Sequence, residues 1–161
     1  MGDIGYCIKY CLSAWTICPY VVRDGQLNPD VRLLNGVNAV ADVTQSVVYN
    51  ALAAVLSGSQ SYAESAASFI QLFFLDSQNG VYPEVNYGQV IRGPGKLVGQ
   101  YLGIIDFRAM VKVANAVGVM RAAKAPAWTS SLDSQMNNWS KQYVSWLQTS
   151  DLGKRAGSAP K

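Results

Sequence analysis

One glycine-rich stretch of the sequence collects polar side chains that could bind a ligand. Asn86, Tyr87 and Gln89 lie close together, and Arg92 follows them. Amide and phenol groups can hydrogen-bond a sugar, and a guanidinium binds a carboxylate through two parallel hydrogen bonds. The glycines among them would let the backbone approach such a ligand closely. These four residues are therefore predicted to bind a sugar or a carboxylate.

The same residues also have a purely structural explanation. The amides of Asn86 and Gln89 could satisfy the backbone of their own loop, and Arg92 could pair with Glu84 or Asp106. The sequence leaves both explanations open.

Catalytic chemistry is limited by the residue types available. The chain has no histidine, which excludes a Ser–His or Cys–His pair and a histidine-bearing metal centre. Cys7, Cys11 and Cys18 do not supply the four ligands that a zinc site usually needs, so no metal or cofactor is expected. Tyr87 beside Arg92 is the one pairing that could transfer a proton.

A second group of aromatic residues lies near the end of the chain. It consists of Trp139, Tyr143, Trp146 and Leu147, at helical spacings of three and four. These residues could line a sugar groove by stacking on the rings. Such spacing is more typical of a buried helix face, and we favour that interpretation.

Composition indicates one folded domain. Hydrophobic residues make up 50% of the 161 residues and charged residues only 14%, so more surface is expected to be covered than a small monomer covers alone. The net charge of +3 is too small and scattered for nucleic-acid binding. Lys154, Arg155 and Lys161 are interpreted as part of a solvated end.

No association with a membrane is expected. No stretch reaches about 20 apolar residues without a charge or a polar run. Asp3 and Lys9 interrupt the apolar start of the chain, so no usable signal peptide is predicted.

The first half of the chain predicts a pair of antiparallel helices. Residues 1–30 have turn signals and are expected to be irregular. Apolar residues then recur at helical spacing from about residue 31 to Leu56, and Gly58 is a natural stop. Ser61 and Glu64 fit a capping box that opens a second helix, which ends around residues 75–76.

The second half repeats this organisation after a long loop. Glycines and prolines rule out a long helix over 76–103, and a loop of this length inside a compact domain is usually functional. A third helix is predicted over about 105–123. Thr129 or Ser130 caps a fourth, and residues 151–161 are expected to form a flexible tail.

Several stretches, taken in order, resemble the alginate lyase-type domain of fungal secreted proteins. They are Cys18-Pro19-Tyr20-Val21, Arg23-Asp24-Gly25, Asn28-Pro29-Asp30-Val31-Arg32, Tyr49-Asn50-Ala51-Leu52-Ala53, Phe74-Leu75-Asp76, Pro83 to Gln89, Arg92-Gly93-Pro94-Gly95 and Gly103-Ile104-Ile105-Asp106. The resemblance covers roughly residues 15–150, and the ordered set is more specific than any one motif.

The resemblance implies an all-α fold of stacked antiparallel helix hairpins, forming part of an incomplete (α/α) toroid over residues 31–150. It also implies an extracellular polysaccharide lyase that cleaves a uronic-acid polymer by β-elimination, with no metal strictly required. In such lyases the segment that matches Asn86, Tyr87, Gln89 and Arg92 is expected to line the substrate cleft. An anionic polysaccharide is therefore the expected partner.

The sequence departs from the family pattern in three ways. The family's Asn-Asn-His-Gly stretch, with its catalytic Asn-His pair, is missing, the later Arg and Tyr residues of the family's site are missing too, and Met1 to about Ala14 is unmatched. We therefore expect a lyase fragment that keeps substrate-binding elements, is inactive alone and could pair with the missing C-terminal half of the domain. The alternatives are a non-catalytic helical module that binds an acidic glycan or a protein, and a minimal catalytic pair of Tyr87 with Arg92.

Overall fold

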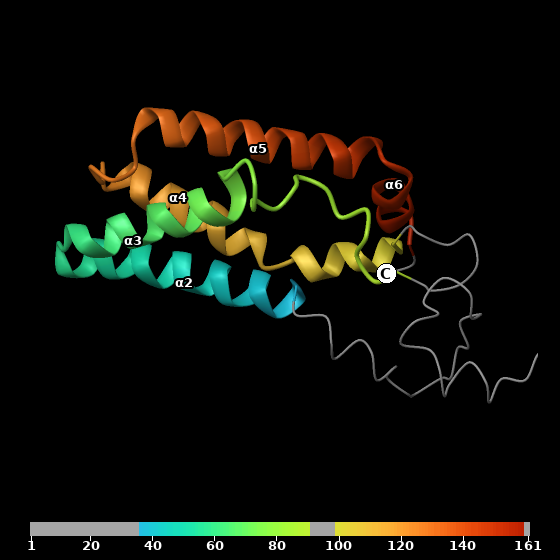
Figure 1. Ribbon diagram of the computed structural model, residues 1–161, viewed down its shortest axis with the longest axis horizontal. Helices are drawn as coiled ribbons and strands as arrows, with labels where there is room; N and C mark the ends of the chain where they lie inside the picture. Colours follow the sequence, from blue (N-terminus) through green and yellow to red (C-terminus); the bar gives the residue numbers. More distant parts are fainter. Residues whose placement is uncertain (1–35, 91–98, 160–161) are drawn as a thin grey trace, which may run out of the picture.

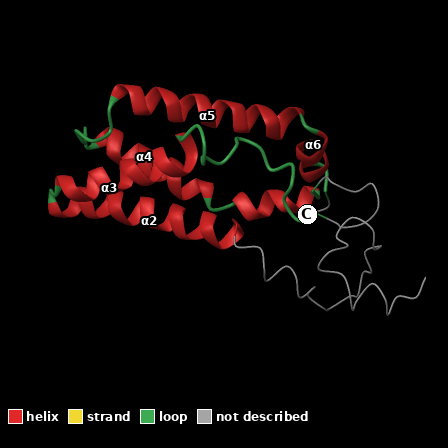
Figure 2. Ribbon diagram, viewed as in Figure 1, coloured by secondary structure: helices red, strands yellow, loops and turns green. Residues whose placement is uncertain are grey.

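The computed structural model describes residues 36–90 and 99–159. These residues form helices and connecting loops without any strand (Figure 2), which confirms the all-α prediction. The elements are α2 (Gly36–Ser57), α3 (Gln60–Ile70), the π-helical turn η2 (Gln71–Leu75), the 3-10 helix η3 (Tyr101–Phe107), α4 (Met110–Ala122), α5 (Ser130–Thr149) and α6 (Asp151–Gly157). The expectations for residues 1–30, the three cysteines, the signal peptide and Arg92 lie outside the described residues.

Helices α2 and α3 form the predicted antiparallel hairpin (Figure 1). Gly58 ends α2 with a φ of +67°, a conformation that glycine adopts without strain. The capping box at Ser61 and Glu64 was wrong. Because α3 already begins at Gln60, Ser61 lies inside it, and the Glu64 carboxylate accepts a hydrogen bond from Gln60 Nε2 at 2.9 Å instead.

The predicted third helix is divided in the structure. The 3-10 helix η3 ends at Phe107, and the regular helix α4 begins at Met110. The predicted cap of the fourth helix is confirmed at Thr129, whose Oγ1 accepts a hydrogen bond from the Leu132 backbone N–H at 3.2 Å. Helix α5 then runs along the other helices for twenty residues (Figure 1).

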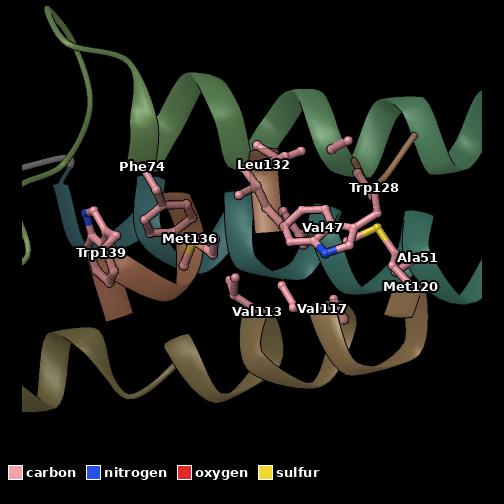
Figure 3. Close-up of a cluster of buried hydrophobic side chains, with 14 residues drawn as sticks. Val47, Ala51, Phe74, Val113, Val117, Met120, Trp128, Leu132, Met136 and Trp139 are labelled. Carbon is pink, nitrogen blue, oxygen red and sulfur yellow. The ribbon is translucent and has the colours of Figure 1, made fainter. Parts of the chain in front are cut away.

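Four helices contribute to one hydrophobic core. Val47 of α2, Ile70 of α3 and Val113 of α4 are completely inaccessible to solvent. Figure 3 shows these helices meeting around side chains of α5 and of the preceding turn, including Trp128, Leu132, Met136 and Trp139. Burial of these apolar surfaces is the main force that holds the helices together.

A polar network joins the end of α4 to the start of α5. The Asp133 carboxylate accepts hydrogen bonds from Arg121 Nε at 2.5 Å, Trp128 Nε1 at 2.7 Å and Asn137 Nδ2 at 3.1 Å. The bonds from Arg121 and Trp128 lower the pKa of the Asp133 carboxyl group because they favour its charged form. This network fixes the short turn between the two helices.

The flexible tail predicted from residue 151 onward was wrong over most of its length. Residues Asp151–Gly157 form α6, and the Ser150 Oγ caps it by accepting a hydrogen bond from the Gly153 N–H at 3.0 Å. Leu152 is buried and ties the helix to the rest of the domain. A polar sequence that also contains a helix cap and one burying leucine can thus fold back as a helix.

Helix α2 is long and apolar enough to cross a membrane, by length and composition alone. In the structure Val40, Thr44, Val47 and Ala51 of this helix are buried against α3 and α4, as in a helix of a protein core. Its outer side remains apolar and exposed, as do parts of η2 and α4. Leu56, Leu72 and Val111 are 86%, 64% and 60% exposed.

Candidate functional site

The segment that carries the predicted site begins in a tight turn after η2. The Asp76 carboxylate accepts hydrogen bonds from the backbone N–H groups of Asn79 and Gln78, at 2.7 and 2.9 Å. These bonds lower the pKa of Asp76 because they stabilise its charged form. Gly80 closes the turn by donating its N–H to the Asp76 carbonyl at 2.9 Å. A Cβ at Gly80 would collide with that carbonyl, so this close turn requires glycine.

Two tryptophans of α5 hold the segment that follows the turn. Trp139 Nε1 donates a hydrogen bond to the Val81 carbonyl at 2.8 Å, and Trp146 Nε1 donates one to Asn86 Oδ1 at 3.1 Å. The two indoles are seven residues apart, or about two helical turns, so they lie on the same face of α5. The segment therefore runs along α5 and is tied to it at two points (Figure 1).

The predicted site itself is a turn that packs against the start of η3. Gly99 N–H donates to the Asn86 carbonyl at 2.6 Å, and Gln100 N–H donates to the Gly88 carbonyl at 2.9 Å. Gln100 Nε2 also reaches the Gln89 carbonyl at 3.2 Å. A Cβ on Gly103 would lie 2.5 Å from the Gly88 oxygen, so the two backbones can meet only because this residue is glycine.

The structure brings three of the four predicted residues together. Asn86 is half-buried, whereas Tyr87 is 74% exposed and projects from the turn. Gln89 is exposed, has a φ of +49° and donates from Nε2 to Asp106 Oδ1 at 3.1 Å. The fourth residue, Arg92, lies outside the described part of the chain, so its role stays a prediction.

The bond from Trp146 decides how the Asn86 amide is oriented. An indole N–H can only donate, so the amide oxygen must face Trp146. The amide NH₂ group therefore does not face the Trp146 indole, and it donates no hydrogen bond to another described residue. Asn86 thus offers two donors from a fixed position next to Tyr87. The Gln89 amide, by contrast, is partly engaged within the fold.

The aromatic residues of α5 pack beneath this segment. Trp139 is only 6% exposed and meets Phe74 edge-on at 5.2 Å between ring centroids, which confirms the core interpretation for this residue. Tyr143 and Trp146 are half-buried, and their rings stack at 6.2 Å. Burial raises the pKa of the Tyr143 hydroxyl. Trp139 and Trp146 thus support the loop through their indole N–H groups.

Two shallow hollows of the described surface lie elsewhere. One, of about 200 Å³, lies where Phe74 and Leu75 meet Gln135, Asn138, Trp139 and Gln142 of α5. The other, of about 350 Å³, lies between α3 and the start of α5. Neither is lined by the predicted site residues. In the Asn86–Gln89 turn it is the exposed Tyr87 side chain that projects into solvent.

The chemistry of this surface is that of binding. It presents a fixed amide donor pair and an exposed phenol on a rigid turn, which suit hydroxyl and carboxylate groups. Across residues 36–90 and 99–159, no group of three potential metal ligands comes together. The sequence analysis missed Trp146 and Gln100 as partners of the turn. Their polar atoms were visible in the sequence, but spacing could not place them there.

Comparisons with known proteins agree with this fold. The family model described as alginate lyase matches residues 11–160. A crystal structure of an alginate lyase from Bacteroides ovatus is 33% identical, with a TM-score of 0.77 over 88% of this chain. The match spans only 36% of that lyase. Among curated proteins the sequence has no significant match.

These matches confirm the resemblance and the fold class of stacked helix hairpins from an (α/α) toroid. The family match extends from the segment before α2 to the end of α6, and so includes the Asn86–Gln89 turn. The chain belongs to the alginate lyase family.

Proposed function

We propose that this chain supplies part of the substrate-binding surface of a polysaccharide lyase that cleaves uronic-acid polymers by β-elimination. The proposal rests on family membership and on one observation above all. Trp146 holds the Asn86 amide oxygen, which leaves the amide NH₂ group free of that bond next to the exposed Tyr87. We assign substrate binding to Asn86, Tyr87, Gln89 and Arg92, and no proton transfer to any of them.

The chemistry of β-elimination explains what such a surface contributes. The uronate carboxylate must be neutralised, a base removes the C5 proton, and an acid protonates the leaving oxygen. Preorganised donors that face the carboxylate stabilise the negative charge that develops on it as the proton leaves. Donors on a turn held by the backbone bonds of Gly99 and Gln100 need little rearrangement to do so.

The proton-transfer groups are proposed to come from outside these 161 residues. The sequence has no histidine, and the chain spans 36% of the lyase structure it matches. Exposed apolar side chains on α2, η2 and α4, including Leu56, Leu72 and Val111, would suit contact with further helices of a longer domain. An extracellular location and an anionic polysaccharide partner belong to the same proposal.

The first test is binding of alginate oligosaccharides to the 161-residue chain, measured by isothermal titration calorimetry. We expect Tyr87→Ala to weaken binding about tenfold, which corresponds to roughly 1.4 kcal/mol. Tyr49→Ala is the matched control, because Tyr49 is 64% exposed but lies on α2. If Tyr87→Ala and Tyr49→Ala bound the oligosaccharides with equal affinity, the turn would not be part of the binding surface.

A second assay separates binding from cleavage. The chain alone is expected to produce no ultraviolet absorbance of unsaturated uronates from alginate, because it lacks a paired acid and base. Cleavage by the wild type that is lost in Tyr87→Phe would instead support the minimal catalytic pair. Failure to bind any uronate polymer would favour a helical module with a protein partner.

A further inference from the structure

Helix α6 places basic residues against η3, the helix on which the candidate site packs. Gly153 packs directly on the backbone of α5, where a Cβ would lie 2.6 Å from the Leu147 carbonyl carbon. This close approach, together with the buried Leu152, turns α6 back against η3 (Figure 1). Lys154 and Arg155, which the sequence analysis assigned to a solvated end, therefore lie on a fixed helix.

Arg155 is held over an aromatic ring at the start of η3. Its guanidinium carbon lies 5.4 Å from the centroid of the Tyr101 ring. A cation at this distance from the ring face is attracted by the negative charge above the ring. The contact restricts a long side chain that would otherwise move freely.

Tyr101 directly follows Gln100, which is bonded to the candidate site. Gln100 donates from its backbone to the Gly88 carbonyl at 2.9 Å and from its side chain to the Gln89 carbonyl at 3.2 Å. The turn is therefore bonded to Gln100, Gln100 is followed by Tyr101, and the Tyr101 ring lies beneath Arg155. Arg155 is thus attached to the same small unit of structure as Tyr87, although 68 residues separate them in the sequence.

The contact leaves the binding groups of Arg155 available. A guanidinium that lies over a ring still has its N–H donors in its own plane, where they can bind a carboxylate bidentately. In the described part of the chain, the side chain has no ion-pair partner. Lys154 precedes Arg155 and adds positive charge, and the Asp106 carboxylate of η3 accepts a bond from Gln89.

We propose that Arg155, positioned by Tyr101, binds a second carboxylate of the polymer whose neighbouring sugar contacts the Asn86–Gln89 turn. This inference rests on the proposed function and names the ionic part of the binding surface. A uronic-acid polymer carries one carboxylate per sugar, so a strand that crosses the turn presents further carboxylates along its length. A fixed cation next to the turn would select such a polymer over a neutral one.

The test compares two forms of one ligand. Binding of alginate oligosaccharides and of the same oligosaccharides with their carboxyl groups reduced to alcohols is measured by calorimetry at low and moderate salt. Arg155→Gln is expected to weaken binding of the charged form about tenfold and to reduce its salt dependence, with no change for the neutral form. Arg155→Lys should fall between wild type and Arg155→Gln.

Two further variants complete the design. Lys124→Gln removes one exposed positive charge at the turn between α4 and α5, away from α6, and is expected to change affinity by less than about twofold. Tyr101→Leu removes the ring beneath Arg155 and should reproduce part of the Arg155→Gln effect. Circular dichroism spectra and unfolding midpoints show whether each variant keeps the fold.

The outcomes separate this inference from the proposed function. If Arg155→Gln and Lys124→Gln bind the charged form equally while Tyr87→Ala has lost affinity, the site stands and the role of Arg155 is wrong. If Arg155→Gln weakens both ligand forms alike, Arg155 does not recognise the carboxylate. If neither form binds to the wild type, both the proposed function and this inference fail.

Discussion

The helical core and the loop residues 76–90 and 99–103 are held together by different forces. In the core, Val47, Ile70 and Val113 meet from three helices and are completely buried. The contacts are apolar and have little directional preference. The long segment instead depends on a few hydrogen bonds, such as those of Trp139 and Trp146, and on glycines that permit close backbone contact.

Because of this difference, the core should mainly determine stability and the loop segment should mainly determine ligand binding. Apolar packing tolerates small shifts but loses free energy in proportion to the volume that is removed. A hydrogen-bonded turn contributes less to stability, yet each of its bonds fixes the position of a specific group. Substitutions in the core should therefore change the free energy of unfolding, and substitutions in the segment should change ligand binding more.

The largest loss of stability is expected from Ile70→Ala. Ile70 is a fully buried member of the hydrophobic core, so its truncation should lower the free energy of unfolding by about 2–5 kcal/mol. Urea denaturation followed by circular dichroism measures this change. Leu72→Ala is the control, because Leu72 is 64% exposed and should cost less than about 0.5 kcal/mol.

The same urea titration distinguishes a self-sufficient helical module from a fragment of a longer lyase domain. A cooperative unfolding transition of the 161-residue chain would show a self-sufficient module. A broad transition that sharpens when further helices of the lyase are supplied would favour the fragment. Equal losses for Ile70→Ala and Leu72→Ala would contradict the position of the core.

An intermediate effect is expected from Gly103→Ala. The new methyl group would lie 2.5 Å from the Gly88 oxygen and would push the site turn away from η3. We expect a loss of about 1–3 kcal/mol in stability together with weaker binding of alginate oligosaccharides. In Gly118→Ala on α4 the methyl group meets no atom within 4 Å, so this control should gain up to about 1 kcal/mol.

Comparison of Gly103→Ala with Gly118→Ala tests whether the contact between Gly88 and Gly103 positions the turn. If Gly103→Ala were as stable as the wild type and bound the ligand equally well, the close approach between residues 88 and 103 would not determine the position of the turn.

The smallest effect on stability is expected from Trp146→Phe. The substitution removes the N–H that orients Asn86 but keeps an aromatic ring against Tyr143. Loss of one hydrogen bond should cost about 1 kcal/mol in stability and should also weaken binding, because the Asn86 amide can then rotate. Calorimetry with alginate oligosaccharides measures the second effect.

Trp139→Phe provides the comparison for Trp146→Phe. It also removes one indole N–H, but the acceptor is the Val81 carbonyl and not a predicted binding group. Because Trp139 is buried in the core, a larger loss of stability with a smaller loss of affinity is expected. If both variants lost affinity equally, Trp146 would act on the whole segment and not on the Asn86 amide.

Much of the fold was predictable because its signals are local. Helix α5 begins at the predicted cap, Thr129, and α2 ends before Gly58, where the backbone needs a positive φ. Two local predictions were wrong because contacts elsewhere in the chain decided the outcome. Ser61 satisfied the pattern of a capping box, but α3 starts earlier, and the polar tail folded because Leu152 found a buried position.

The sequence by itself determined the helical class, the hairpin order and the residue types of the candidate site, because helix periodicity, caps and glycines act over a few neighbouring residues. Only the tertiary structure decided which groups meet the Asn86–Gln89 turn. Trp146 reaches the turn from 60 residues away, and Arg155 reaches Tyr101, next to Gln100, from 54 residues away. Such contacts depend on how the helices pack, and packing is set by the shape of the whole apolar core.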